Sequence, residues 1–140
     1  MDHLSPEARS ALMRGIRRRD TRPEVTLRKL LHGLGYRYRI CRPDLPGTPD
    51  LTFPSRRAVI FVHGCFWHRH SCRRGRSVPR TNRTEWLAKF QRNICRDRRN
   101  RIQLRKCGWR VLVVWECQLR ASKLPATIPR VIAFLEARAA

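Results

Sequence analysis

The residues from His63 to Cys72 hold the side chains best suited to chemistry in this 140-residue chain. Cys65, His70 and Cys72 have the spacing C-x4-H-x-C, and Cys117 follows far downstream. Thiolates and imidazoles are zinc ligands, so these four residues can supply a closed Cys3His site of the structural kind. The alternative is that the cysteines are ordinary core residues.

Two histidines of the same stretch are left over from this ligand set, His63 and His68. An imidazole titrates near neutral pH, so either ring is a candidate general acid or base. Phe66 and Trp67 lie between them in a polar, glycine-flanked segment. Such aromatic side chains are either core residues or a wedge that enters a base step of a nucleic acid, and the sequence favours neither interpretation.

Three carboxylates have both a chemical and a structural interpretation. Asp50 follows Pro49 at the start of a strand, where it could bind Mg²⁺ or hydrogen-bond its own backbone in a turn. Glu24 ends a Thr-x-x-Glu capping box that begins at Thr21, although it could also be an outer metal ligand. Asp97 is either a surface ion-pair partner or the carboxylate that orients a histidine.

The charge of the chain favours a polyanionic partner. Lys and Arg number 32 against 10 Asp and Glu, which gives a formal net charge of +22. Nucleic acid is the first candidate for such a small basic protein. Nearly all of the cations are arginines, whose planar fork suits phosphates and guanine edges, although a GC-rich genome explains the same bias equally well.

The cysteines and the hydropathy together predict a cytoplasmic protein. No apolar run is long enough to span a bilayer, and the first residues do not read as a secretory signal. We therefore interpret the clustered cysteines as metal ligands rather than as partners in disulfide bonds. Cys41, Cys95 and Cys107 have no neighbouring ligands, so we expect them to be buried thiols.

Hydrophobic periodicity and turn residues divide the chain into elements that position these groups. The helix over 84–106 is expected to bury a stripe formed by Leu87, Phe90, Ile94 and Ile102, and Trp109 and Trp115 are expected in the core. The predicted helices are the basic arm within residues 1–19, 21–35, 84–106 and 125–139, and the predicted strands are 36–40, 50–53, 58–62 and 109–115.

This order predicts an α/β fold in which a mixed central sheet is flanked by helices. Residues 20–140 are expected to form a single domain, and residues 1–19 are expected to form a basic N-terminal arm. Segments 63–72 and 116–117 both come just after the C-terminal ends of strands, where the sites of α/β proteins tend to form.

Four segments of the chain closely resemble the very short patch repair (Vsr) endonucleases. They are residues 46–50, 61–72, 93–99 and 108–117. The resemblance implies a restriction-endonuclease-like fold with a structural zinc site. It also implies Mg²⁺-dependent nicking of duplex DNA on the 5′ side of the thymine in a T:G mismatch, the product of 5-methylcytosine deamination.

The resemblance also assigns roles to residues of this chain, each carried over from a matching motif. Asp50 and the backbone carbonyl of Val62, which stands where the family has Thr, would bind Mg²⁺, with Glu24 close by. His68 would activate water, steadied by Asp97 and assisted by His63. The zinc ligands would be Cys65, His70, Cys72 and Cys117, and the DNA contacts would come from Met13, Phe66, Trp67, Trp86, Lys89 and Asn93.

The resemblance further implies a monomer that starts very short patch repair in the bacterial cytoplasm, on nucleoid DNA, with mismatch-repair proteins as further partners. Two alternatives remain from the residues themselves. One is a zinc-stabilised nucleic-acid-binding protein without catalysis, which leaves Asp50, His63 and His68 without a role. The other is a restriction-like nuclease with a different DNA target.

Overall fold

The computed structural model describes residues 21–137. The arm predicted over residues 1–19, including Met13, lies outside this range. Within residues 21–137, no helix combines the length and the apolar character that crossing a bilayer requires.

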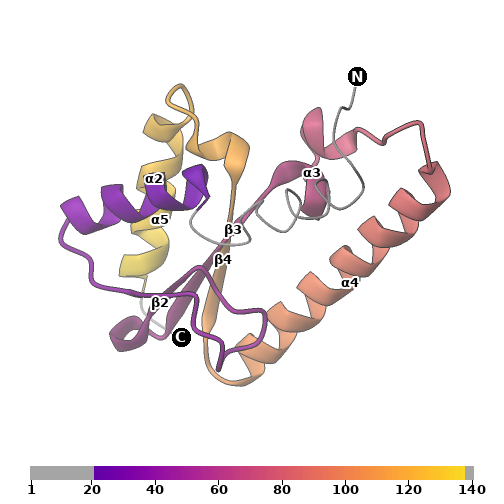
Figure 1. Ribbon diagram of the computed structural model, residues 1–140. Helices are drawn as coiled ribbons and strands as arrows, with labels where there is room; N and C mark the ends of the chain where they lie inside the picture. Colours follow the sequence, from indigo (N-terminus) through magenta and orange to yellow (C-terminus); the bar gives the residue numbers. More distant parts are fainter. Residues whose placement is uncertain (1–20, 138–140) are drawn as a thin grey trace, which may run out of the picture.

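Four strands form one mixed sheet in the order β1-β2-β3-β4 (Figure 1). β1 pairs with β2 and β2 pairs with β3 in antiparallel fashion, whereas β3 and β4 are parallel. This arrangement confirms the mixed sheet expected from the sequence, although β1 is shorter than the predicted strand. The strands are β1 (Arg39–Ile40), β2 (Leu51–Phe53), β3 (Ala58–His63) and β4 (Arg110–Trp115).

The apolar strand β3 lies between β2 and β4 and has helices on both of its faces. On one face Ile60 packs in a cluster with Leu31 and Val131, which belong to α2 (Arg22–Gly33) and α5 (Leu124–Glu136). On the other face Val59 packs with Leu104 of α4 (Arg83–Lys106). Figure 1 shows α2 and α5 together on one side of the strands and α4 on the other. Burial on both faces explains why the β3 sequence is almost wholly apolar.

Helix α2 begins and ends close to the predicted residues, but its capping differs. Pro23 lies in its first turn, and Gly35 follows its end with a φ of +95°. Thr21 is the N-cap residue, yet its side chain makes no capping hydrogen bond. The capping box predicted for Thr21 and Glu24 is therefore wrong, and buried Glu24 has another role.

The stripe predicted on the long helix α4 is wrong for three of its four residues. Phe90 is buried, but Leu87, Ile94 and Ile102 are 44%, 41% and 42% exposed. A helix of 24 residues is roughly 36 Å long, and in Figure 1 α4 runs well past the sheet. Apolar residues on the part of the helix beyond the sheet have no sheet surface to cover, and Ile102 faces away from the sheet, about half a turn from buried Leu104.

The three isolated cysteines do not lie in the core as expected. Cys95 and Cys107 are exposed on or just after α4, and Cys41 is half-buried. Trp109 is buried, as predicted, whereas Trp115 is only half-buried because it faces the site described below. Three short helical elements that were not predicted carry site residues: α3 (Cys65–His68), η2 (Arg74–Arg76) and η3 (Glu116–Leu119).

Candidate metal centre and active site

The parallel pairing of β3 with β4 brings the predicted zinc ligands together. His63 at the end of β3 is aligned with Trp115 at the end of β4, so the segments that follow both strands meet at one end of the sheet. The first contributes Cys65, His70 and Cys72, and the second contributes Cys117. The four ligand atoms all lie within 4.8 Å of one another.

The spacing of these atoms fits a tetrahedral zinc site. Nδ1 of His70 lies 3.5 Å from Sγ of Cys117 and 3.8 Å from Sγ of Cys65. Zinc bonds of ordinary length at a tetrahedral angle place a nitrogen and a sulfur about 3.6 Å apart. The Cys3His cluster is thus consistent with a zinc site, as the sequence predicted.

The cysteines of the cluster differ in the electrostatics of their thiols. Burial raises the pKa of Cys65 to about 12, and the nearby thiols of Cys72 and Cys117 add to this effect. The backbone N–H of Gly75 lowers the pKa of Cys72 to about 6 by stabilising its thiolate. Gly75 approaches the His70 backbone so closely that an added Cβ would lie 1.9 Å from the His70 carbonyl oxygen.

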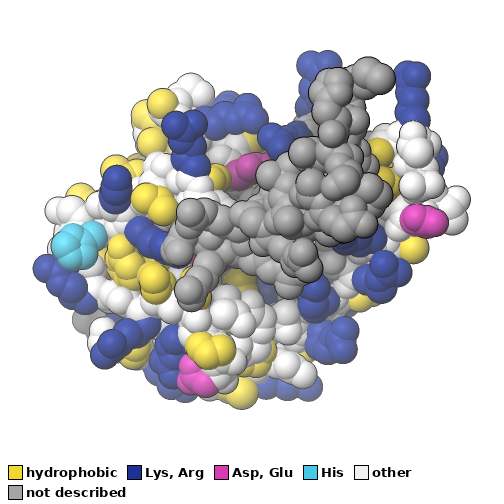
Figure 2. All heavy atoms as spheres, in the orientation of Figure 1, with side chains coloured by type: hydrophobic (Ala, Val, Ile, Leu, Met, Phe, Trp, Pro, Cys, Tyr) yellow, Lys and Arg dark blue, Asp and Glu magenta, His cyan; other side chains and the backbone are white. Residues whose placement is uncertain are grey.

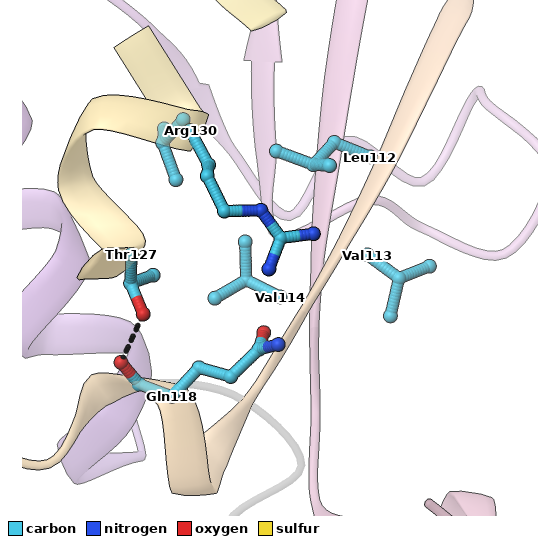
Figure 3. A pocket seen from close by; sticks show the side chains of 7 residues that line it. Leu112, Val113, Val114, Gln118, Thr127 and Arg130 are labelled. Carbon is cyan, nitrogen blue, oxygen red and sulfur yellow. Dashed lines mark hydrogen bonds between the residues drawn. The ribbon is translucent and has the colours of Figure 1, made fainter. Parts of the chain in front are cut away.

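Two hydrogen bonds hold the element η3, which carries Cys117, in place. The backbone N–H of Cys65 donates to Oε1 of Glu116 at 3.0 Å, which joins η3 to α3. Thr127 of α5 donates from its hydroxyl to the carbonyl of Gln118 at 2.7 Å (Figure 3). The cavity beside this bond measures about 20 Å³, room for roughly one water molecule, so it serves packing rather than substrate binding.

Asp50 lies at the same end of the sheet, just before β2. Its Oδ2 accepts a hydrogen bond of 2.6 Å from the backbone N–H of Val62 in β3. Burial raises the pKa of Asp50 to about 7; the Val62 hydrogen bond opposes this rise, and the charge of nearby Glu24 adds to it. Two carboxylates in one buried pocket repel each other, and a cation bound between them would relieve that repulsion.

Glu24 and Cys41 complete the group around Asp50. Glu24 is 3% exposed and forms an ion pair of 3.0 Å with Arg28, one helical turn later. Ligand atoms of Glu24, Cys41 and Asp50 lie within 4.8 Å of one another. Sequence reasoning missed Cys41, and only the pairing of β1 with β2, which sets residue 41 beside residue 50, would have revealed it.

The two spare histidines are stacked at the end of β3. Their rings are 3.9 Å apart between centroids and nearly parallel. Nδ1 of His68 is 2.6 Å from Oδ2 of Asp97, which projects from α4. Burial raises the pKa of Asp97, but the hydrogen bond to His68 and the charges of nearby basic groups together outweigh this effect, and the pKa lies below its usual value. Burial lowers the pKa of His63 to about 3, so this ring is neutral at physiological pH.

Trp115 connects the cysteine cluster to these histidines, a role that the sequence did not suggest. Its ring stacks on that of His70 at 4.4 Å between centroids and meets the edge of His63 at 5.3 Å. The alignment of His63 with Trp115 across β3 and β4 creates this contact.

The aromatic residues expected to contact DNA form one group outside the two core clusters. Phe66, Trp67 and Trp86 have centroid distances of 5.2 to 5.7 Å, and all three are half-buried. The ammonium of Lys89 lies 4.9 Å from the Trp67 ring. Asn93 is buried and donates to the Trp67 carbonyl at 3.1 Å, so in this structure its amide supports the aromatic group.

The outer side of α4 is strongly basic. An open groove of about 740 Å³ runs along it, lined by Lys89, Arg92, Arg96 and Arg99. Figure 2 shows Lys and Arg side chains widely spread over the visible face, with few Asp or Glu side chains. A basic groove beside half-buried aromatic rings is the surface expected for binding a nucleic-acid backbone.

Comparison with known proteins agrees with this geometry. The family described as DNA mismatch endonuclease Vsr matches residues 1–74. The chain is 54% identical over 118 residues to the type II nicking enzyme V.XorIIP of Xanthomonas oryzae, covering 84% of this chain and 86% of that protein. It is 49% identical over 112 residues to the DNA mismatch endonuclease Vsr of Escherichia coli, covering 80% and 71% of the two chains. The type II nicking enzyme V.NmeAIP of Neisseria meningitidis is 41% identical over 119 residues, covering 85% and 84%.

Proposed function

Because the chain belongs to the Vsr family of DNA nicking endonucleases, we propose that it cuts one strand of duplex DNA on the 5′ side of the thymine in a T:G mismatch. The observation that carries the proposal is the His68–Asp97 pair, which lies beside His63 at the sheet end that also holds Asp50. Family membership excludes the non-catalytic alternative that the sequence alone had left open.

Asp50, Glu24 and the carbonyl of Val62 are the groups we propose for Mg²⁺. Hard oxygen ligands suit this ion, and burial together with neighbouring Glu24 raises the pKa of Asp50, so a bound cation would favour its ionised form. When bound, Mg²⁺ would neutralise charge on the scissile phosphate and favour attack by water.

His68 is the proposed general base. Asp97 holds Nδ1 of its ring, so Nε2 is the nitrogen left to accept a proton from the attacking water. Asp97 remains ionised because its pKa is low, and it stabilises the imidazolium that forms. Neutral His63 keeps the His68 ring in place by stacking and can donate a hydrogen bond to the phosphate.

Zinc in the Cys3His cluster would act structurally in this proposal. The cluster ties α3, which carries His68, to η3 at the end of β4. Since all four positions of the ion would be filled by protein ligands, zinc would have no open position for substrate.

The aromatic group of Phe66, Trp67 and Trp86 is the proposed mismatch wedge. Insertion of apolar side chains between bases costs the least free energy at a mismatch, where pairing is already weakened. Lys89 would contact the bases, with Asn93 beside it, and Met13 would approach from the arm.

The proposed biological role is very short patch repair of deaminated 5-methylcytosine. The enzyme would act as a monomer on nucleoid DNA in the bacterial cytoplasm, with mismatch-repair proteins as partners. Similarity to enzymes named type II nicking enzymes makes the identity of the target the part of this proposal that most needs testing.

End-labelled duplexes that differ at one base pair test the target. The protein is incubated with Mg²⁺ and with T:G, T:A or C:G at the same position, in several flanking sequences. We expect a nick 5′ of the thymine in the T:G duplex and little cutting of the others. Equal cutting of T:G and T:A would reject mismatch specificity and favour a restriction-like target.

A further inference from the structure

A thiol lies in the pocket of the proposed magnesium ligands, where ordinary Mg²⁺ chemistry has no use for it. Sγ of Cys41, a carboxylate oxygen of Glu24 and one of Asp50 are within 4.8 Å of one another. Magnesium prefers oxygen ligands, whereas thiolates prefer softer ions such as Cd²⁺ and Zn²⁺. The pocket therefore combines ligands for two classes of metal.

The fold holds Cys41 in this position through its backbone and its side chain. Its N–H donates to the carbonyl of Asp50 at 3.3 Å, directly beyond the paired ends of β1 and β2. One guanidinium nitrogen of Arg28 contacts both Sγ of Cys41, at 3.9 Å, and the Glu24 carboxylate, at 3.0 Å. The thiol and the two carboxylates thus belong to a single contact network.

We propose that Cys41 makes the catalytic metal pocket a mixed oxygen and sulfur site, which binds thiophilic divalent cations in competition with Mg²⁺. Such a cation is bound by the Cys41 thiolate together with Asp50 and Glu24, and the thiol proton is released to solvent. Metal exchange at this pocket inhibits nicking without disturbing the Cys3His cluster. The inference rests on the proposed magnesium role of Asp50.

Cadmium NMR tests the site without requiring activity. The full-length, zinc-loaded protein is titrated with ¹¹³Cd²⁺, and signals from a Cys3His site and from a site with one sulfur and two carboxylates are distinguished by their chemical shifts. The variants are Cys41→Ser, Asp50→Asn and the control Cys107→Ser, which removes an exposed thiol at the end of α4. Serine keeps the size of the side chain and removes only the soft ligand.

We expect the one-sulfur signal in the wild type and in Cys107→Ser, its loss in Cys41→Ser, and its weakening in Asp50→Asn. The Cd²⁺ concentration that halves nicking of a T:G duplex should rise at least about tenfold in Cys41→Ser, equivalent to the loss of one favourable ligand bond. An unchanged cadmium signal or an unchanged inhibitory concentration in Cys41→Ser would overturn the inference.

Failure of the inference and failure of the proposed function give different results. If T:G nicking depends on Mg²⁺ and Asp50 while Cys41→Ser binds cadmium like the wild type, only the role of the thiol is rejected. If the cadmium signal depends on Cys41 but Asp50→Asn still nicks, the mixed site exists and the proposed magnesium role of Asp50 is rejected.

Discussion

The Cys3His cluster and the Asp50 pocket lie at the same end of the sheet. Burial disfavours the charged forms of Cys65 in the cluster and of Asp50 in the pocket, but only the cluster also has a group, Cys72, whose charged form its surroundings favour. In the cluster, hydrogen bonds from Gly75 and Cys65 to neighbouring groups fix the loops, and the pKa of Cys72 is lowered toward the thiolate that zinc requires. In the Asp50 pocket, burial and Glu24 raise the pKa of Asp50 against the ionised form. In the proposed function the first arrangement stabilises the fold, whereas the second leaves a buried carboxylate that a bound cation would stabilise.

The largest effect is expected at His68, at the same end of the sheet as the Asp50 pocket. Replacing His68→Ala removes the proposed base, and loss of several kcal/mol of transition-state stabilisation should lower the nicking rate about 10³-fold or more. Binding of the T:G duplex, measured by gel shift, should change little. Full nicking by this variant would contradict the assignment.

In the Cys3His cluster, Cys117→Ser should lower the stability of the folded protein. Loss of one zinc ligand should cost roughly 3 kcal/mol or more and lower the melting temperature by about 10 °C. Zinc content and thermal melting are the measurements, and Cys107→Ser, an exposed thiol, is the matched control. A melting curve equal to that of the control would show that Cys117 is a plain thiol.

Asp97→Asn should have an intermediate effect on activity. The amide still reaches Nδ1 of His68 but cannot stabilise an imidazolium, and groups that orient a catalytic histidine in this way typically contribute about 10- to 100-fold. Single-turnover nicking measures this loss, with melting temperature as the control for folding. Rates equal to the wild type would mean that the pair is only a surface contact.

Asp50→Asn should stabilise the protein in magnesium-free buffer while removing its activity. Because the pKa of Asp50 is higher in the folded protein than the unfolded value of about 4, its contribution to stability is full below that pH and is lost as the pH rises through about 7. At pH 8 the variant should melt a few degrees higher than the wild type, a gain of about 1 kcal/mol, and the difference should shrink at pH 5. A variant less stable than the wild type at pH 8 would contradict the account of a carboxylate whose ionised form is disfavoured by burial.

A further effect on stability concerns a glycine beside the cluster. An added Cβ on Gly75 meets the His70 carbonyl, so Gly75→Ala should lower stability by about 1–3 kcal/mol and weaken zinc retention. Gly33→Ala in α2 is the control, because nothing lies within 4 Å of its added Cβ and helix propensity favours alanine. Equal melting temperatures for the two variants would show that the segment around Gly75 can shift at little cost to accommodate the added methyl group.

The same contrast separates what the sequence predicts from what only the structure reveals. Local patterns predicted the buried strand β3, the helix α2 and three residues of the Cys3His cluster, Cys65, His70 and Cys72, because apolar periodicity and ligand spacing are local properties. Cys117, the fourth ligand, lies far downstream in the sequence. Cys41 and Trp115 belong to the site because of strand register. Pairing of β1 with β2 places residue 41 beside residue 50, and pairing of β3 with β4 places residue 63 beside residue 115. Long-range pairing of this kind leaves no mark on the sequence near either residue.

The exposed apolar residues of α4 illustrate the opposite error. Helical spacing predicted one buried face that includes Leu87, Ile94 and Ile102, but a helix buries only the residues that another element covers. Ile102 lies about half a turn from buried Leu104 and so faces away from the sheet. Cys95 and Cys107 are likewise exposed, on α4 and just after its end. Periodicity predicted the helix correctly and could not predict how far it extends past the sheet.

The central claim is that one end of the sheet holds two metal sites with separate purposes, and anomalous X-ray scattering tests it most directly. Crystals of the zinc-containing protein are soaked in Mn²⁺ as a substitute for Mg²⁺ and measured at the zinc and manganese absorption edges. We predict a zinc peak among Cys65, His70, Cys72 and Cys117 and a separate manganese peak beside Asp50. Manganese among the cysteines, or no manganese beside Asp50, would contradict the account.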